Sequence, residues 1–117
     1  MQTLQALPQI HASAAALYPG LPLRLGLQSI GMRTNPYGRA CAPNPAGARV
    51  AMAERDPRHG ALFGAAFMVG VLAATEGHPV ARLALGAVAG PFDLADAPAW
   101  RVVHAAAAMA GAMRLSL

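Results

Sequence analysis

The side chains best suited to chemistry lie in a stretch rich in glycine and proline. Arg33 offers a guanidinium, Asn35 a carboxamide and Tyr37 a phenol. Such groups hydrogen-bond to sugar hydroxyls and carboxylates, and an arginine can contact a carboxylate through two parallel bonds. We therefore predict that Arg33, Asn35 and Tyr37 bind a substrate. The alternative is an ordered loop in which Arg33 pairs with a carboxylate and Asn35-Pro36 forms a turn.

The other reactive side chains have weaker support. Cys41 could be a nucleophile, but no base partner is identifiable, so a bystander thiol is favoured. Glu54 and Asp56 lie at a predicted helix start, where capping and the helix dipole explain them better than a catalytic carboxylate pair. Asp93 and Asp96 follow the second predicted strand. That is the side of an α/β barrel that holds active sites, although a solvated loop explains them better.

Signatures of metal or cofactor binding are missing from the sequence. A single cysteine excludes an internal disulfide and a cysteine-based metal site. There is no G-x-S-x-G elbow, no P-loop and no dinucleotide fingerprint. The histidines lack ligand spacing, and we predict that each lies at the surface or at a helix end. They are His11, His59, His78 and His104. We predict neither a metal nor a cofactor.

Two strands and three helices are predicted to position these groups. In chain order we expect a helix over 4–17 whose regular part begins near Pro8, a strand over 21–27, a loop over 28–50, a helix body over 61–74, a strand over 80–88 and a helix over 99–113. Asp56 is predicted to cap the second helix, Pro57 to be its first residue and Gly77 to end it. Strands separated by helices predict an α/β fold with a parallel sheet.

The predicted strand over 80–88 is mostly apolar, as a strand buried on both faces should be. Two parallel strands cannot close a barrel, and they leave both sheet edges open. We therefore expect residues 1–117 to form a single fragment of a larger domain, or a piece that depends on a partner chain.

The composition fits a piece of a larger core. Hydrophobic residues make up 56% of the chain and charged residues 12%, against roughly a quarter charged in typical soluble domains. A membrane protein is an alternative. However, the uncharged run over 60–75 contains three glycines and falls short of the roughly 20 residues that a spanning helix needs. We favour a buried helix, and no contact with membrane.

Charge and targeting signals are also informative. The net charge is +4, but the nine basic residues are spread from Arg24 to Arg114, so we expect no nucleic-acid partner. The N-terminus lacks the pattern of a secretory signal, and one cysteine fits a reducing compartment. We expect a cytoplasmic protein.

Three stretches resemble the D-apionate lactonase family, a group with a glycosidase-like (β/α)8 barrel. They are 29–38 (SIGMRTNPYG), 49–52 (RVAM) with 56–58 (DPR), and 62–66 (LFGAA); 90–92 (GPF) fits the same pattern. The resemblance covers about Leu21 to Leu115. It implies a partial (β/α)8 barrel of about two βα units, in which the two strands are the seventh and eighth and the last helix closes the domain.

The resemblance implies hydrolysis of a sugar-derived lactone to an aldonate-type acid, within carbohydrate metabolism. Ring opening needs a water, a base and donors for the developing oxyanion. Arg33, Asn35 and Tyr37 are the expected substrate or oxyanion contacts. Related glycosidases place a carboxylate nucleophile at the end of the seventh strand, whereas here the strand ends in Gly26-Leu27-Gln28-Ser29. A retaining two-carboxylate mechanism therefore has no support here.

The expected partners are a small sugar lactone and the rest of the barrel or another protein chain. Because the acid and base of the reaction are expected elsewhere, the chain is predicted to be inactive alone. A non-catalytic interaction protein and a small membrane protein remain alternatives.

Overall fold

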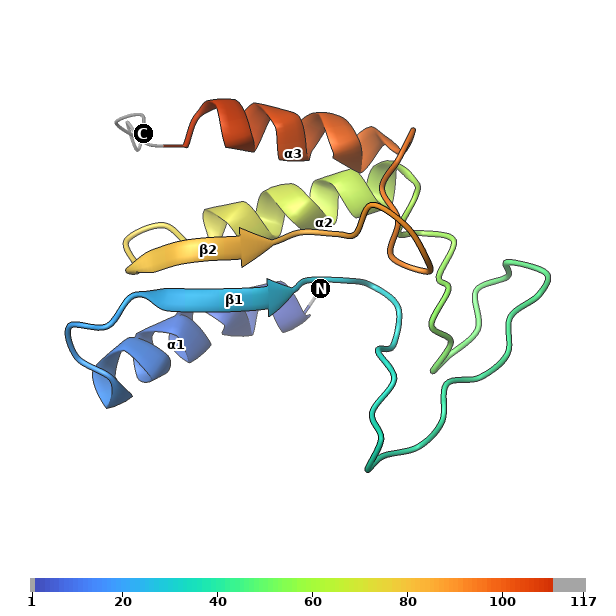
Figure 1. The fold of residues 1–117 in the computed structure, drawn as a ribbon, viewed down its shortest axis with the longest axis horizontal. Coiled ribbons are helices and arrows are strands. Elements are labelled where there is room, and N and C mark those ends of the chain that lie inside the picture. Colours follow the sequence, from blue (N-terminus) through green and yellow to red (C-terminus); the bar gives the residue numbers. More distant parts are fainter. Residues whose placement is uncertain (1, 111–117) are drawn as a thin grey trace.

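Three helices and two strands alternate along the chain. The computed structural model describes residues 2–110, which form α1 (Gln2–Leu17), β1 (Leu23–Leu27), α2 (Leu62–Ala73), β2 (Val80–Ala84) and α3 (Pro98–Ala108) (Figure 1). The strands pair in parallel as a two-stranded sheet. The predicted α/β class, element order and parallel pairing are confirmed. This is the arrangement of two βα units of a (β/α)8 barrel. Met113, at the predicted end of the last helix, lies outside the described residues.

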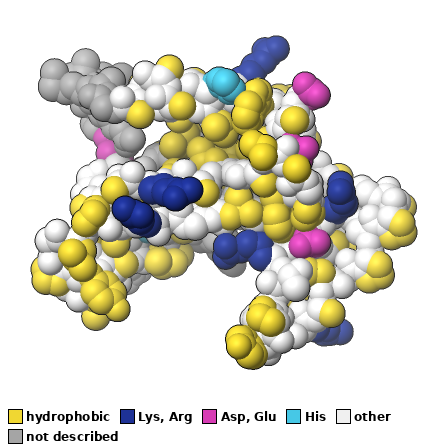
Figure 2. Space-filling model, in the orientation of Figure 1, with side chains coloured by type: hydrophobic (Ala, Val, Ile, Leu, Met, Phe, Trp, Pro, Cys, Tyr) yellow, Lys and Arg dark blue, Asp and Glu magenta, His cyan; other side chains and the backbone are white. Residues whose placement is uncertain are grey.

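One face of the sheet is covered and the other is open. Leu23, Leu25 and Leu27 are partly buried, whereas Arg24 and Gly26 between them are exposed. Successive side chains of a strand point to opposite faces, so the leucines face the helices. In Figure 1 the helices α1 and α2 lie behind the strands. Figure 2 shows arginine side chains gathered over the opposite, open face.

Two arginines are neighbours on that open face. The register places Arg24 opposite Arg82 and Leu25 opposite Leu83, with one irregularity before Arg24 and another after Leu25. Paired residues of adjacent strands point to the same face. Within residues 2–110, the ion pair that the structure shows joins Arg58 to Asp56. Arg24 and Arg82 therefore face outward together without a carboxylate from the described part of the chain.

The strand β2 is shorter and less buried than predicted. It ends at Ala84, and within it Ala81 and Arg82 are exposed. Beyond the strand the chain turns back on itself, because Ala87 N donates to Phe92 O (2.9 Å) and Leu94 N to Ala87 O (3.2 Å). The prediction of a strand over 80–88 is therefore wrong beyond Ala84. The exposure of Ala81 and Arg82 agrees with the expectation that residues 2–110 do not supply the neighbours that would bury this strand.

The first helix runs through a proline. Pro8 lies inside α1, which begins at Gln2, so the prediction that the regular helix starts near Pro8 is wrong. Pro8 removes one backbone hydrogen bond, but residues on either side anchor the helix. Leu7 is buried in the core, and the buried His11 donates from Nδ1 to Ala74 O at 2.9 Å. The predicted surface position of His11 is therefore also wrong.

The second helix begins later than predicted. It starts at Leu62 with Ala61 at its N-cap, five residues after Pro57. The helix ends at Ala73, and Gly77 adopts a positive φ of 73° in the turn that follows. Glycine adopts this conformation without the strain that other residues incur. Gly77 thus ends the turn rather than the helix itself.

The described residues form one small core. Met68 and Val71 of α2 are fully buried and pack with Leu7, Ala74, Leu85, Leu94 and Ala99. The accessible surface is 8159 Å², whereas a compact monomer of this mass exposes about 6,000 Å². Large apolar side chains such as Leu62 and Val88 are exposed. This excess of surface fits a segment that packs against further structure.

No helix within residues 2–110 is long and apolar enough to cross a membrane. The uncharged run over 60–75 is mostly taken up by the short helix α2, whose Met68 and Val71 lie in the core.

Candidate functional site

The connections that follow the two strands begin at the same edge of the sheet. The connection over 28–61 leaves the carboxyl end of β1, and the connection over 85–97 leaves that of β2 (Figure 1). In (β/α)8 barrels the active site is built from the connections that follow the strands. The polar residues of these two connections are therefore the candidates for a site.

The connection over 28–61 is held in shape by backbone hydrogen bonds. Met32 N donates to Ala53 O and Ala42 N to Met52 O, both at 2.9 Å. Gly31 packs so closely on Glu54 that a Cβ would overlap the Glu54 carbonyl oxygen. Two distant parts of the connection thus run side by side, and the segment after Gly31 leaves this contact in a defined direction.

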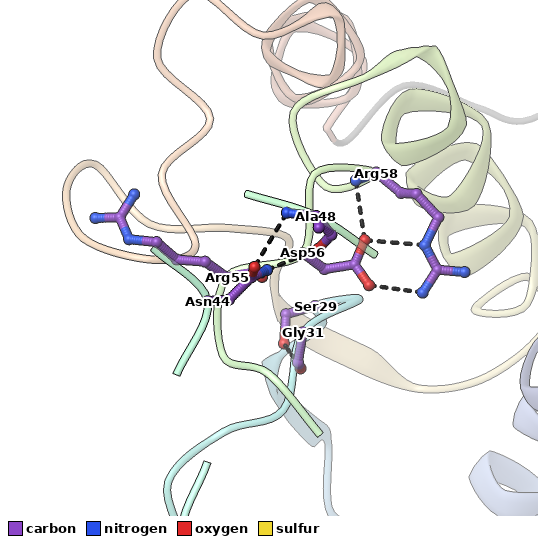
Figure 3. A network of polar contacts seen from close by, with 7 residues as sticks. All are labelled: Ser29, Gly31, Asn44, Ala48, Arg55, Asp56 and Arg58. Carbon is purple, nitrogen blue, oxygen red and sulfur yellow. Dashed lines mark hydrogen bonds and ion pairs between the residues drawn. The ribbon is translucent and has the colours of Figure 1, made fainter. Parts of the chain in front are cut away.

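A second tie within the connection comes from Asn44. Its Nδ2 donates to Ala48 O (2.7 Å) and Arg55 O (2.8 Å), and its Oδ1 accepts from Ala48 N (3.0 Å) (Figure 3). One side chain therefore closes the turn over 44–48 and fastens it to the segment before α2. Asn44 has a structural role.

Arg33 extends back toward the end of β1. Its Nη1 lies 4.0 Å from the position that a Cβ on Gly26 would take. Gly26 is exposed, as is Arg24 two residues before it, so both belong to the open face of the sheet. The described residues show no ion pair to Arg33, so the alternative in which it pairs with a carboxylate is not observed there. Its guanidinium remains exposed at the carboxyl edge.

Asn35 forms the turn that the alternative interpretation predicted. Its Oδ1 accepts from Tyr37 N at 3.0 Å, and its backbone oxygen accepts from Gly38 N at 3.1 Å. Arg33, Thr34, Asn35 and Pro36 line a shallow hollow. Tyr37 does not line it and is 98% exposed. The structure therefore brings Arg33 and Asn35 together, and leaves Tyr37 outside.

The two carboxylates at the predicted helix start, Glu54 and Asp56, hydrogen-bond to different partners. Glu54 accepts from Thr34 Oγ1 at 3.3 Å, beside the hollow. Asp56 makes a two-pronged contact with Arg58, from Nε to Oδ1 (2.9 Å) and from Nη2 to Oδ2 (2.6 Å) (Figure 3). Asp56 Oδ1 also accepts from Arg58 N. Asp56 thus caps its own turn instead of the helix, and its predicted N-cap role is wrong.

The contact with Arg58 makes Asp56 sensitive to pH. The side-chain hydrogen bond from Arg58 lowers the pKa of Asp56 below its usual value, although burial opposes the shift. A carboxyl whose pKa is lower in the folded state stabilises the fold above its unfolded pKa, and this contribution is lost as pH falls through the folded pKa. The stabilisation is therefore present at pH 7 and declines below about pH 4.

We expect Asp56→Asn to destabilise the chain by about 1–2 kcal/mol at pH 7, since a hydrogen-bonded charge is lost. The difference between variant and parent should shrink as pH falls toward 3. Chemical denaturation followed by circular dichroism measures both. Asp96→Asn is the matched control, because Asp96 is exposed and its φ of 60° suits asparagine. An equal difference at pH 7 and pH 3 would contradict this role of Asp56.

A second hollow lies between the two connections. It has a volume of about 390 Å³ and is lined by Gly47, Arg55, Asp56, Pro57, His59, Gly60, Gly90, Pro91 and Asp93. We call it the inter-loop cavity. His59 is 3% exposed, so its predicted surface position is wrong. Its burial comes from Phe92, which lies far along the chain and contacts the imidazole edge-on, and the local sequence gives no signal of this.

Within residues 2–110, no three His, Cys, Asp or Glu side chains are grouped so that they could hold a metal ion.

Comparison with known proteins gives the family. The profile of the family described as "D-apionate lactonase, TIM barrel domain" matches residues 1–114. The D-apionate lactonase of Brucella anthropi is 45% identical over 94 residues, which cover 80% of this chain and 15% of that protein. The chain thus spans about 15% of the length of this curated relative. No solved structure matches. The chain belongs to the D-apionate lactonase family, by its match to the TIM-barrel domain.

Proposed function

We propose that this chain is the C-terminal part of a sugar-lactone hydrolase, in which it supplies two βα units and part of the substrate site. The observation that carries the proposal is the placement of Arg33. Its guanidinium lies over the end of β1, at the edge where barrel enzymes hold their substrates. The 45% identity to a D-apionate lactonase supports the choice of a sugar-derived lactone as substrate.

The hollow formed by Arg33 and Asn35 suits the binding of the lactone carbonyl. The side-chain oxygen Oδ1 of Asn35 accepts from Tyr37 N, so the hydrogens on Asn35 Nδ2 are the groups left for a ligand. Arg33 and Asn35 thus both present donors. Such donors bind the lactone carbonyl and stabilise the negative charge that develops on its oxygen when water attacks. Tyr37 reaches the substrate only if another part of the barrel brings it inward.

The residues that activate water are not supplied by this hollow. The end of β1 carries Gly26, Leu27, Gln28 and Ser29, with no carboxylate among them. Glu54 does not line the hollow, and its carboxylate accepts a hydrogen bond from Thr34, which does. The general base that ring opening requires is therefore assigned to another part of the barrel. On this proposal the chain is inactive alone, acts in carbohydrate metabolism in the cytoplasm and needs no cofactor.

The test compares hydrolysis by residues 1–117 alone with hydrolysis by the same chain joined to the sequence encoded upstream of it. D-apionolactone and a panel of aldonolactones are the substrates, and acid release is followed by pH-stat titration. We expect activity in the longer protein only. Activity in residues 1–117 alone would contradict their role as a fragment. Inactivity of both proteins would refute the proposed lactonase activity and leave a non-catalytic, partner-dependent role.

A further inference from the structure

Three arginines lie on the open face of the sheet. The register sets Arg24 beside Arg82, and paired residues of neighbouring strands, which lie about 4.8 Å apart, point to the same face. Gly26 follows Arg24 by two residues, so a Cβ on Gly26 would point to this face as well. Arg33 Nη1 lies 4.0 Å from the position of that Cβ. Arg33 therefore reaches over the face that carries Arg24 and Arg82.

The space over Gly26 is open to a ligand. Apart from Arg33 Nη1, and leaving aside the two chain neighbours of Gly26, no atom of the described residues lies within 4 Å of the position of its Cβ. Arg24 precedes Gly26 by about 7 Å along the strand, a distance that an extended arginine side chain covers. A small ligand over Gly26 can thus contact Arg33 and be reached by Arg24 and Arg82.

The charge on this face is uncompensated within residues 2–110. Arg24, Arg33 and Arg82 are all exposed, and the ion pair that the structure shows joins two other residues, Arg58 and Asp56. Charges of one sign that gather on one surface raise the local concentration of the opposite ion. A second copy of this chain would bring the same three arginines, so charge complementarity favours an anion as the occupant.

We propose that the open face binds the carboxylate of a sugar acid over Gly26, between Arg33 on one side and Arg24 with Arg82 on the other. This inference rests on the proposed function for its choice of ligand. Hydrolysis converts an uncharged lactone into an acid that is ionised at pH 7. Guanidinium groups bind carboxylates through charge-assisted hydrogen bonds. The face therefore prefers the product to the lactone.

The same atoms link this site to the proposed reaction. Arg33 is the proposed donor to the lactone carbonyl, and that carbonyl carbon becomes the carboxylate carbon of the acid. The negative charge thus forms beside Arg33, where Arg24 and Arg82 add their attraction only once the charge is present. A site of this kind holds the acid after ring opening, and we expect the acid to inhibit the enzyme.

The first test uses residues 1–117 labelled with ¹⁵N-arginine, in cold, slightly acidic buffer. The Nε–Hε resonance of each arginine is assigned from the variant that lacks it. Sodium D-apionate replaces sodium chloride step by step at constant ionic strength. We expect the resonances of Arg24, Arg33 and Arg82 to shift with a common Kd. Freshly dissolved D-apionolactone should leave Arg24 and Arg82 unmoved, because it carries no charge.

The variant Arg24→Gln separates binding from folding. Arg24 is exposed and forms no ion pair with a described residue, so we expect circular dichroism to show an intact fold. D-apionate should bind about tenfold more weakly, the effect of one lost charge-assisted hydrogen bond. Arg82→Gln should give the same loss and decides the matter where Arg24→Gln fails to fold. Arg101→Gln is the matched control, because it removes an exposed arginine from α3, which packs against α2.

A second test uses the longer protein and product inhibition. Arg24→Gln should raise the Ki of D-apionate by a larger factor than the KM of D-apionolactone, because only the acid is charged. Equal factors would overturn the inference. An unchanged Ki would also overturn it, and would assign Arg24 and Arg82 to carboxylates of the part of the protein that covers this face.

Other outcomes separate this inference from the proposed function. Sodium acetate that binds as tightly as D-apionate, or an unchanged Kd in both Arg24→Gln and Arg82→Gln, overturns the sugar-acid site even where the longer protein hydrolyses lactones. Equal shifts of Arg24 and Arg82 with the lactone and with the acid overturn it too. Binding of D-apionate that depends on Arg24, beside a longer protein without lactonase activity, supports the site and refutes the proposed function.

Discussion

Replacing Arg33 by alanine in the longer, active protein is expected to lower kcat/KM for D-apionolactone about 10²-fold, the effect of removing one donor to a developing oxyanion. Arg33 lies at the carboxyl edge of the sheet with an exposed guanidinium. The fold should be unaffected, because the described residues show no ion pair that the substitution would break. Steady-state kinetics, with circular dichroism as the check on folding, measure the effect.

Two further variants distinguish charge from geometry at this position. Arg33→Lys keeps the charge but loses the planar pair of donors, so we expect most of the loss to remain. Arg39→Ala removes an exposed arginine from the same connection and outside the lining of the hollow, and we expect it to leave kcat/KM near the parent value. Equal effects of Arg33→Ala and Arg39→Ala would show that general charge, and not a specific contact, matters.

Replacing Gly31 by alanine is expected to break the packing of the connection over 28–61. The new Cβ would overlap the Glu54 carbonyl and also press on Phe92 at 3.3 Å. Because the obstacle is backbone, a rotamer change cannot relieve it, and we expect a cost of about 3 kcal/mol, the upper part of the range for overpacking. The part of the chain that carries Arg33 should then separate from the segment over 52–54.

Hydrogen exchange of single amides measures this separation. Protection should fall at Met32 and Ala42, whose amides donate to Ala53 and Met52. The amides within α2 should keep theirs, because that helix is held by the core. Gly60→Ala is the control, since its Cβ would have no atom within 4 Å and its backbone does not need glycine. Undiminished protection at Met32 in Gly31→Ala would refute this account of how the connection is held.

The elements of the fold could be predicted from the sequence because local patterns define them. The alternation of leucine over 21–27 and the apolar run over 61–74 give a strand and a helix at nearly their observed places. Errors occur where tertiary contacts decide. Pro8 is tolerated inside α1 because the helix is anchored on both sides. Asp56 caps its own turn because Arg58 lies close enough to bind its side chain.

The site could be predicted only in part for the same reason. The types and spacing of Arg33 and Asn35 predicted a binding stretch, and the structure places both on one hollow. Tyr37 shares the local pattern but points away, because the turn that starts at Asn35 reverses the chain. The predicted surface position of His59 was wrong, since its side chain is buried and hydrogen-bonds within the described residues to Phe92, 33 residues later. Contacts between residues so far apart in the sequence leave no periodic pattern of residue types.

The register that sets Arg24 beside Arg82 has a consequence for how the sheet forms. Two like charges side by side on neighbouring strands repel and weaken the pairing. Dissolved salt screens such repulsion over about 8 Å at physiological ionic strength, so pairing of β1 with β2 should become easier as salt is added. A carboxylate brought by whatever covers the open face would replace the salt. The pairing of these two strands therefore depends on ionic strength, because the described residues supply no carboxylate to either arginine.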